Sequence, residues 1–193
     1  MLNNPIHTVV NTKPSAWLCR FSALIKPQGQ VLDLACGTGR NVRWLAGQGF
    51  VVEAVDKDLA ALASLQNIPN ITTRIADLEG APWPYAERKF DAIVVCRYLH
   101  RPLLPLLLQS LNAKGVLIYE TFMQGQELYG RPRRPQFLLK PDELLQTYMN
   151  QSNIVAFEQG LFDEAQLEEP PFKTHQPAML QRICLTRLQD KTP

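Results

Sequence analysis

The chain has 193 residues, of which 46% are hydrophobic and 20% are charged, and its formal net charge is +2. This length suits one compact domain and leaves little room for a second. The hydrophobic fraction excludes a mostly disordered chain. The balance of 20 basic against 18 acidic residues disfavours a dedicated nucleic-acid binder, which usually carries a marked excess of positive charge.

The cysteines and the N-terminus predict a cytoplasmic protein. The four cysteines, at positions 19, 36, 96 and 184, lie far apart and show no metal-ligand spacing, so we expect no metal site. The first residues lack the charged-then-apolar pattern of a signal peptide. The apolar stretches are far shorter than the ~20 residues needed to cross a membrane, so we expect no membrane association.

Runs rich in Val and Ile alternate with helical stretches, which is the pattern of a parallel sheet with crossover helices. The predicted strands are 31–34, 50–55, 71–75, 91–95 and 115–120, and the predicted helices are 14–25, 40–48, 58–66 and 103–111. Several of these strands are almost continuously apolar, as expected when both faces of a sheet are covered.

The pattern changes after the fifth strand. Residues 124–141 hold three prolines, two glycines and four basic side chains, which predicts a long loop that is either functional or disordered. A helix over 141–150 and strands over 153–158 and 180–187 follow, and the two strands form an antiparallel edge pair because a loop joins them. The predicted fold is a Rossmann-like, doubly wound α/β sheet of seven mostly parallel strands with an antiparallel last strand.

The segment VLDLACGTGRN, residues 31–41, joins a strand to a helix through a glycine turn. Gly37 and Gly39 allow a ligand to approach the backbone closely, at the edge of the sheet where open α/β folds bind ligands. A phosphate-binding P-loop is excluded because no GxxxxGK run exists. A dinucleotide fingerprint is disfavoured because Val42 stands where its third glycine belongs. Binding of S-adenosylmethionine is the third interpretation.

DLACGTGR resembles the first motif of the class I S-adenosylmethionine-dependent methyltransferases, with Asp33 as the acidic strand end and Gly37–Gly39 as the turn. Three later segments follow the family's order: AVDKD with Asp56, ADLEG with Asp77, and FDAIVVCRYLH. RYLHRPLLP and YETF are similar to segments of small bacterial methyltransferases related to the tellurite-resistance and type 11/12 groups. The resemblance implies S-adenosyl-L-methionine as cofactor.

The resemblance also implies the cofactor-binding residues. Asp56 would accept the ribose hydroxyls and Asp77 the adenine amino group. Alternatively, Asp56 is an exposed acid at a strand end, and Asp77 starts a turn or caps a helix. Trp17 and Arg20 of the N-terminal helix would cover the methionine end. The other expected residues of this site are Asp33, Ala35, Cys36, Gly37, Thr38, Gly39, Asn41, Lys57, Ala76, Leu78, Cys96 and Arg97.

Ala35 stands where many members carry a glycine, which is tolerated if its backbone is in an ordinary region. Cys96 is expected to be a small buried residue rather than a nucleophile. Methyl transfer from a sulfonium needs an oriented acceptor, and needs a base only when the acceptor loses a proton.

The candidate catalytic residues are Tyr98, His100 and Glu120. His100 is the first choice as a base because its ordinary pKa lies near neutrality, unless it only begins a helix. Arginines of the 124–141 loop could bind an anionic acceptor, or pair with the acidic segment 158–169.

A small-molecule acceptor is favoured, because the chain lacks the Asn/Asp-Pro-Pro-Tyr/Phe segment of nucleic-acid amino-methyltransferases and any appended nucleic-acid module. RNA or protein acceptors, a non-catalytic cofactor-binding protein and a nicotinamide-dependent oxidoreductase are the alternatives. Within one domain, 1–193, we expect a helical extension (1–29), a cofactor-binding core (30–122), a substrate-side loop (123–141), and a C-terminal helix with edge strands (142–193).

Overall fold

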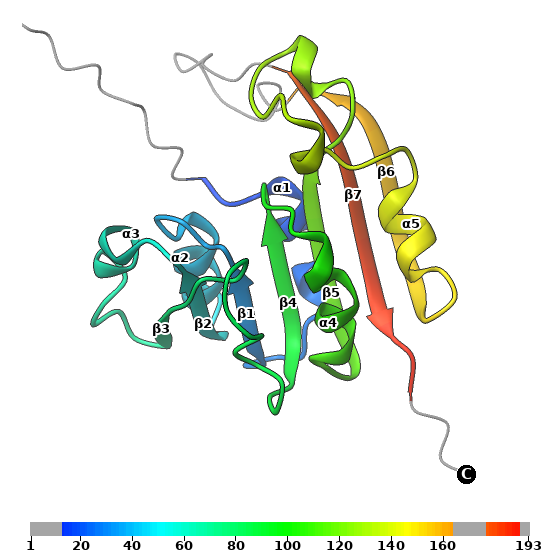
Figure 1. The fold of residues 1–193 in the computed structure, drawn as a ribbon. Helices are drawn as coiled ribbons and strands as arrows, with labels where there is room; N and C mark the ends of the chain where they lie inside the picture. Colours follow the sequence, from blue (N-terminus) through cyan, green and yellow to red (C-terminus); the bar gives the residue numbers. More distant parts are fainter. Residues whose placement is uncertain (1–12, 164–176, 190–193) are drawn as a thin grey trace, which may run out of the picture.

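The computed structural model describes residues 13–163 and 177–189. Its centre is one seven-stranded sheet with the strand order β3-β2-β1-β4-β5-β7-β6 (Figure 1). The strands are β1 (Gln30–Leu34), β2 (Val51–Asp56), β3 (Ile71–Ile75), β4 (Phe90–Cys96), β5 (Leu111–Phe122), β6 (Ser152–Phe162) and β7 (Ala178–Arg187).

The strand directions confirm the predicted fold class. The strands from β3 to β5 pair in parallel, whereas β7 runs antiparallel to both of its neighbours, β5 and β6. The sheet is therefore mostly parallel, with the last strand of the chain reversed. The strand order reverses at β1, so the carboxyl ends of β1 and β4 flank the crevice in which doubly wound sheets bind ligands.

Helices cover both faces of the sheet, because alternate strand residues are apolar on each side. The face that carries Val31, Val94 and Ile118 packs against α1 (Ala16–Phe21), α2 (Arg40–Gly47) and α3 (Leu59–Ala63). The opposite face packs against α4 (Leu104–Gln109) and α5 (Glu143–Tyr148), which stand in front of the sheet in Figure 1. We call these the α1 face and the α4 face.

The connection between β3 and β4 contains no helix, and aromatic side chains cover the sheet instead. Tyr85 is fully buried and packs edge-on against Trp83 and Phe90, with ring centroids 5.2 and 5.3 Å away. Nearby, the buried carboxylate of Glu53 is paired with two arginines, Arg74 and Arg88. This connection leaves the carboxyl end of β3 open.

The predicted elements are present, with shifted ends. The fifth strand begins at Leu111, four residues before its prediction, so the preceding helix ends at Gln109. The edge strands β6 and β7 extend to 11 and 10 residues. The 124–141 loop contains two short 3₁₀ turns, Gln126–Leu128 and Pro135–Phe137. In the described part of the chain, none of the helices is long and apolar enough to span a membrane.

Candidate functional site

The glycine turn between β1 and α2 uses left-handed backbone at three positions. Ala35, Gly37 and Gly39 have φ angles of 53°, 54° and 79°. A Cβ on Gly39 would lie only 2.5 Å from the Leu65 side chain, so the helix can begin here only with glycine. Ala35 differs from the expectation, since its backbone is not in an ordinary region and a Cβ is strained there.

Asp56 fixes the turn from the neighbouring strand. One oxygen of its carboxylate accepts a hydrogen bond from the Gly37 amide at 2.8 Å, and the other accepts one from the Asp58 amide at 3.0 Å. The carboxylate therefore lies directly beside the glycine turn at the carboxyl end of β2. Its position fits the predicted role in binding a ligand that lies against this turn.

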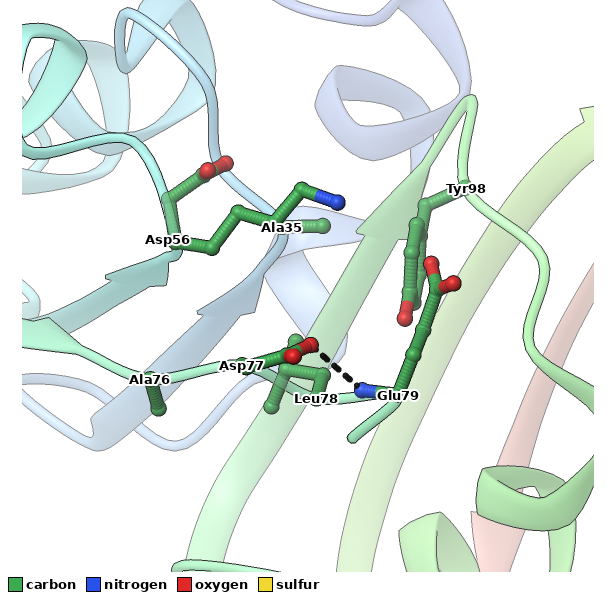
Figure 2. A pocket seen from close by; sticks show the side chains of 8 residues that line it. Ala35, Asp56, Ala76, Asp77, Leu78, Glu79 and Tyr98 are labelled. Carbon is green, nitrogen blue, oxygen red and sulfur yellow. Dashed lines mark hydrogen bonds between the residues drawn. The ribbon is translucent and has the colours of Figure 1, made fainter. Parts of the chain in front are cut away.

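A cavity of about 250 Å³ opens beside this turn (Figure 2). It is lined by Ala35, Asp56, Lys57, Ala76, Asp77, Leu78, Glu79 and Tyr98. Six of these eight were predicted as cofactor residues, so the structure brings together segments that follow β1, β2 and β3. Glu79 was not predicted, although its place two residues after Asp77 in the same turn could have indicated it.

Asp77 is presented to this cavity by hydrogen bonds from its own turn. The Glu79 amide donates to its carboxylate at 3.0 Å, and this bond, with one from the Gly80 amide, lowers the pKa of Asp77. The carboxylate is therefore ionised at neutral pH and can only accept hydrogen bonds.

Tyr98 stands on the opposite wall of the cavity, beside Glu79 (Figure 2). Burial, followed by the charge of Glu79, raises the pKa of its phenol above the ordinary value. The phenol therefore stays protonated, and this residue is placed to line the nucleotide-sized cavity rather than to act as a base. His100 begins a 3₁₀ turn just beyond and is not among the cavity-lining residues.

Asp33 lies on the α1 face and is 1% exposed. One oxygen of its carboxylate accepts no hydrogen bond. Burial raises the pKa of this carboxyl from 3.8 to about 7, and the nearby charge of Arg40 opposes the shift only in part. Asp33 does not line the cavity, but a buried carboxyl with a strongly shifted pKa is a typical feature of binding sites.

Cys96 and Glu120 lie side by side on β4 and β5, on the same face as Asp33. The Cys96 thiol donates to Glu120 at 3.1 Å and accepts from Arg40 at 3.0 Å. Burial, and then the charge of Glu120, raises the pKa of the thiol well above its ordinary value. The thiol is therefore neutral, as expected for a residue that is not a nucleophile, but Cys96 is half-buried rather than buried.

Four further residues were predicted to bind the cofactor, and three of them contact other residues of the protein. The Cys36 thiol donates to the Gly37 carbonyl at 3.6 Å, and burial raises its pKa as well. Asn41 is 4% exposed and accepts from the Ser15 amide at 2.9 Å. The Thr38 side chain is exposed. Arg97 follows β4 with a φ of 61° and stacks on Phe122, 4.7 Å from the ring centroid.

The structure does not bring Trp17 or Arg20 to the cavity. The Trp17 indole is 2% exposed and donates to the Ile183 carbonyl of β7 at 3.1 Å. Arg20 pairs with Glu158 of β6 at 2.6 Å. Helix α1 therefore packs these two side chains over the edge strands, because its apolar side must cover that part of the sheet.

The 124–141 loop is fastened at its C-terminal part by Arg101. This guanidinium donates to the carbonyls of Gln136 and Leu138, both at 2.8 Å, and pairs with the Glu143 carboxylate at 2.6 Å. Arg131, Arg133 and Arg134 are exposed on this loop. Residues 164–169 of the acidic segment lie outside the described residues, so the predicted pairing stays a prediction.

Known proteins resemble this chain in sequence over one segment and in the fold of the whole sheet. Residues 31–113 match a family of methyltransferase domains. TehB from Haemophilus influenzae superposes with a TM-score of 0.69 at 20% identity, over 89% of this chain and 61% of that one. A TehB-like S-adenosylmethionine-dependent methyltransferase from Corynebacterium glutamicum gives 0.60 at 19% identity, over 89% and 86%.

A further structural neighbour is an S-adenosylmethionine-dependent methyltransferase from Mesorhizobium loti, with a TM-score of 0.66 at 18% identity, over 90% of this chain and 98% of that one. At these identities, the likeness concerns the fold. This chain spans 61% of the length of the Haemophilus protein. No protein of curated function matches the sequence.

Residues 31–113 are thus similar to a methyltransferase domain, and the fold of the chain is similar to that of S-adenosylmethionine-dependent methyltransferases. Residues 31–113 match the methyltransferase domain family, and the cofactor that this match implies is S-adenosyl-L-methionine.

Proposed function

We propose that this protein transfers the methyl group of S-adenosyl-L-methionine to a small-molecule acceptor. The observation that carries the proposal is a line of three carboxylates at the carboxyl ends of three adjacent strands. Asp33 belongs to β1, Asp56 ends β2, and Asp77 follows β3. The cofactor has three groups of hydrogen-bond donors along its length, namely the ammonium, the ribose hydroxyls and the adenine amino group.

The residues present fit this cofactor. The oxygen of Asp33 that accepts no hydrogen bond is buried, and an ammonium group would satisfy it. Asp56 would hold the ribose hydroxyls, while Asp77 and the Leu78 amide would bind the adenine. When bound, the cofactor supplies an electrophilic methyl group on a positively charged sulfur.

Two sequence features support a small acceptor. The fourth strand ends at Cys96 and is followed by Arg97 and Tyr98, rather than by the Asn/Asp-Pro-Pro-Tyr/Phe segment that resembles a nucleic-acid amino-methyltransferase site. The exposed arginines of the 124–141 loop form a small set, which would neutralise few phosphates.

The test is transfer of a labelled methyl group to the small-molecule, RNA and protein fractions of a bacterial lysate. We expect label in the small-molecule fraction, and we expect Asp56→Ala to abolish it because the cofactor is no longer held. Label confined to RNA or protein would contradict the proposed acceptor. Absence of transfer, together with retained binding of S-adenosylhomocysteine, would favour the non-catalytic alternative.

A further inference from the structure

A row of polar side chains crosses the apolar α1 face of the sheet. The register of β4, β5 and β7 places Cys96 opposite Glu120, and Glu120 opposite Arg182. We call these three residues the polar row. The side chains of Glu120 and Arg182 are only 3% and 11% exposed. Burying an ion pair removes both charges from water at a large cost in free energy, so apolar residues would serve the fold at least as well.

The two carboxylate oxygens of Glu120 have different surroundings. Oε1 accepts the hydrogen bond from the Cys96 thiol at 3.1 Å. Oε2 lies 3.3 Å from Nε of Arg182, yet it is buried and accepts no hydrogen bond. A buried oxygen that has an ion-pair partner but accepts no hydrogen bond is unusual in a native structure and calls for an explanation.

The polar row is adjacent to the methionine side of the proposed cofactor site. Arg40, in the first turn of α2, donates to the Cys96 thiol at 3.0 Å and lies close enough to Asp33 to influence its pKa. Electrostatic attraction therefore links Asp33 to Arg40, and hydrogen bonds continue from Arg40 through Cys96 to Glu120. The adenine-side cavity contains Tyr98 and Leu78, which pack on the opposite face. The row therefore lies on the same face of the sheet as Asp33, the residue proposed to bind the ammonium group of the cofactor.

We infer that Glu120 Oε2 receives the proton of the methyl acceptor, and that the acceptor is a hydroxyl or amine compound. This inference rests on the proposed function. The acceptor oxygen or nitrogen forms the bond to the methyl carbon, while the carbon–sulfur bond breaks and its electron pair stays on sulfur. The acceptor proton passes to Glu120, and from there to water. Cys96 and Arg182 act as positioning residues that fix the carboxylate.

The inference separates two classes of nucleophile. Hydroxyl and amine acceptors lose a proton on methylation, so a carboxylate base contributes to their rate by about 10²–10⁴-fold. Anions such as iodide and thiocyanate have no proton to lose at neutral pH, so a carboxylate base does not raise the rate of their methylation. The probes are phenol, catechol, aniline and benzylamine in the first class, and iodide and thiocyanate in the second.

The test compares Glu120→Gln with the matched control Glu158→Gln. Glu158 lies opposite Arg182 on β6, is 33% exposed and pairs with Arg20. We expect turnover of at least one hydroxyl or amine probe, a loss of at least 100-fold in kcat for Glu120→Gln, and a change below threefold for Glu158→Gln. S-adenosylhomocysteine affinity should stay within twofold of the wild type in both variants.

The inference is overturned if only iodide or thiocyanate, or none of the probes, is methylated, or if both variants lose the same activity. If Glu120→Gln does not fold, Glu120→Asp keeps the charge but withdraws the oxygens, and it should still lower kcat without changing S-adenosylhomocysteine binding. Failure of the wild type to bind S-adenosylhomocysteine would instead contradict the proposed function, so the two failures are distinguishable.

Discussion

Ala35 occupies the left-handed backbone region with a φ of 53°. A residue with a Cβ is strained there by roughly 1–3 kcal/mol, whereas glycine is not. The side chain lines the cavity and packs only partly against the core, so its contacts offset little of this strain. The residue before the glycine turn therefore stores strain at the edge of the site.

Replacing this alanine should stabilise the protein. We expect Ala35→Gly to raise the free energy of unfolding by about 1 kcal/mol, measured by urea denaturation, because the strain disappears. The control is Ala60→Gly in the first turn of α3, where glycine should destabilise by about 0.5–1 kcal/mol. A loss of stability in both variants would contradict the strain argument.

Asp33 should make stability depend on pH. Burial raises its folded-state pKa from 3.8 to about 7, so its stabilising contribution is complete below about pH 4 and is lost as pH rises through 7. Asp33→Asn, which carries no titrating group, should gain stability relative to the wild type over this range, by at most roughly 4 kcal/mol. Urea denaturation of both proteins at pH 4.5 and 8 measures this gain. The same difference at both pH values would refute the shifted pKa.

Among the secondary elements, the turn after β3 positions the second carboxylate of the cavity. Gly80 packs so closely that a Cβ would lie 2.6 Å from an Asp77 oxygen. We expect Gly80→Ala to displace this carboxylate and to weaken S-adenosylhomocysteine binding about tenfold, the loss of one charge-assisted hydrogen bond. Calorimetry measures the affinity. Gly47→Ala, where a Cβ meets nothing within 4 Å, is the control and should bind normally. If Gly80→Ala and Gly47→Ala bind S-adenosylhomocysteine with equal affinity, Asp77 does not bind the adenine.

The strands and the glycine turn could be predicted because their signals are local: apolar runs, Gly37, Gly39 and the acids at strand ends. The polar row could not, since Arg182 meets Glu120 only through the antiparallel register of β7, sixty-two residues further along the chain. The position of Trp17 on the sheet could not be predicted either. Its helix was predicted, but the sequence does not state which part of the sheet that helix covers.

Across the whole molecule, the residues assigned to the proposed cofactor site lie on both faces of the sheet. The adenine-side cavity opens next to residues that pack on the α4 face, such as Leu78, whereas Asp33 and the polar row lie on the α1 face. A cofactor bound along the strand ends would cross from one side to the other at β1, where the strand order reverses. The proposed base, Glu120, therefore lies on the other face of the sheet from cavity-lining residues such as Leu78 and Tyr98.

Calorimetric titration of the purified protein with S-adenosylhomocysteine, with NAD as the comparison ligand, tests the central claim most directly. We predict that S-adenosylhomocysteine binds, that NAD does not, and that Asp56→Ala weakens the first at least tenfold because its carboxylate no longer accepts the ribose hydroxyls. Binding of NAD alone, or of neither ligand, would contradict the assignment of this site to S-adenosylmethionine.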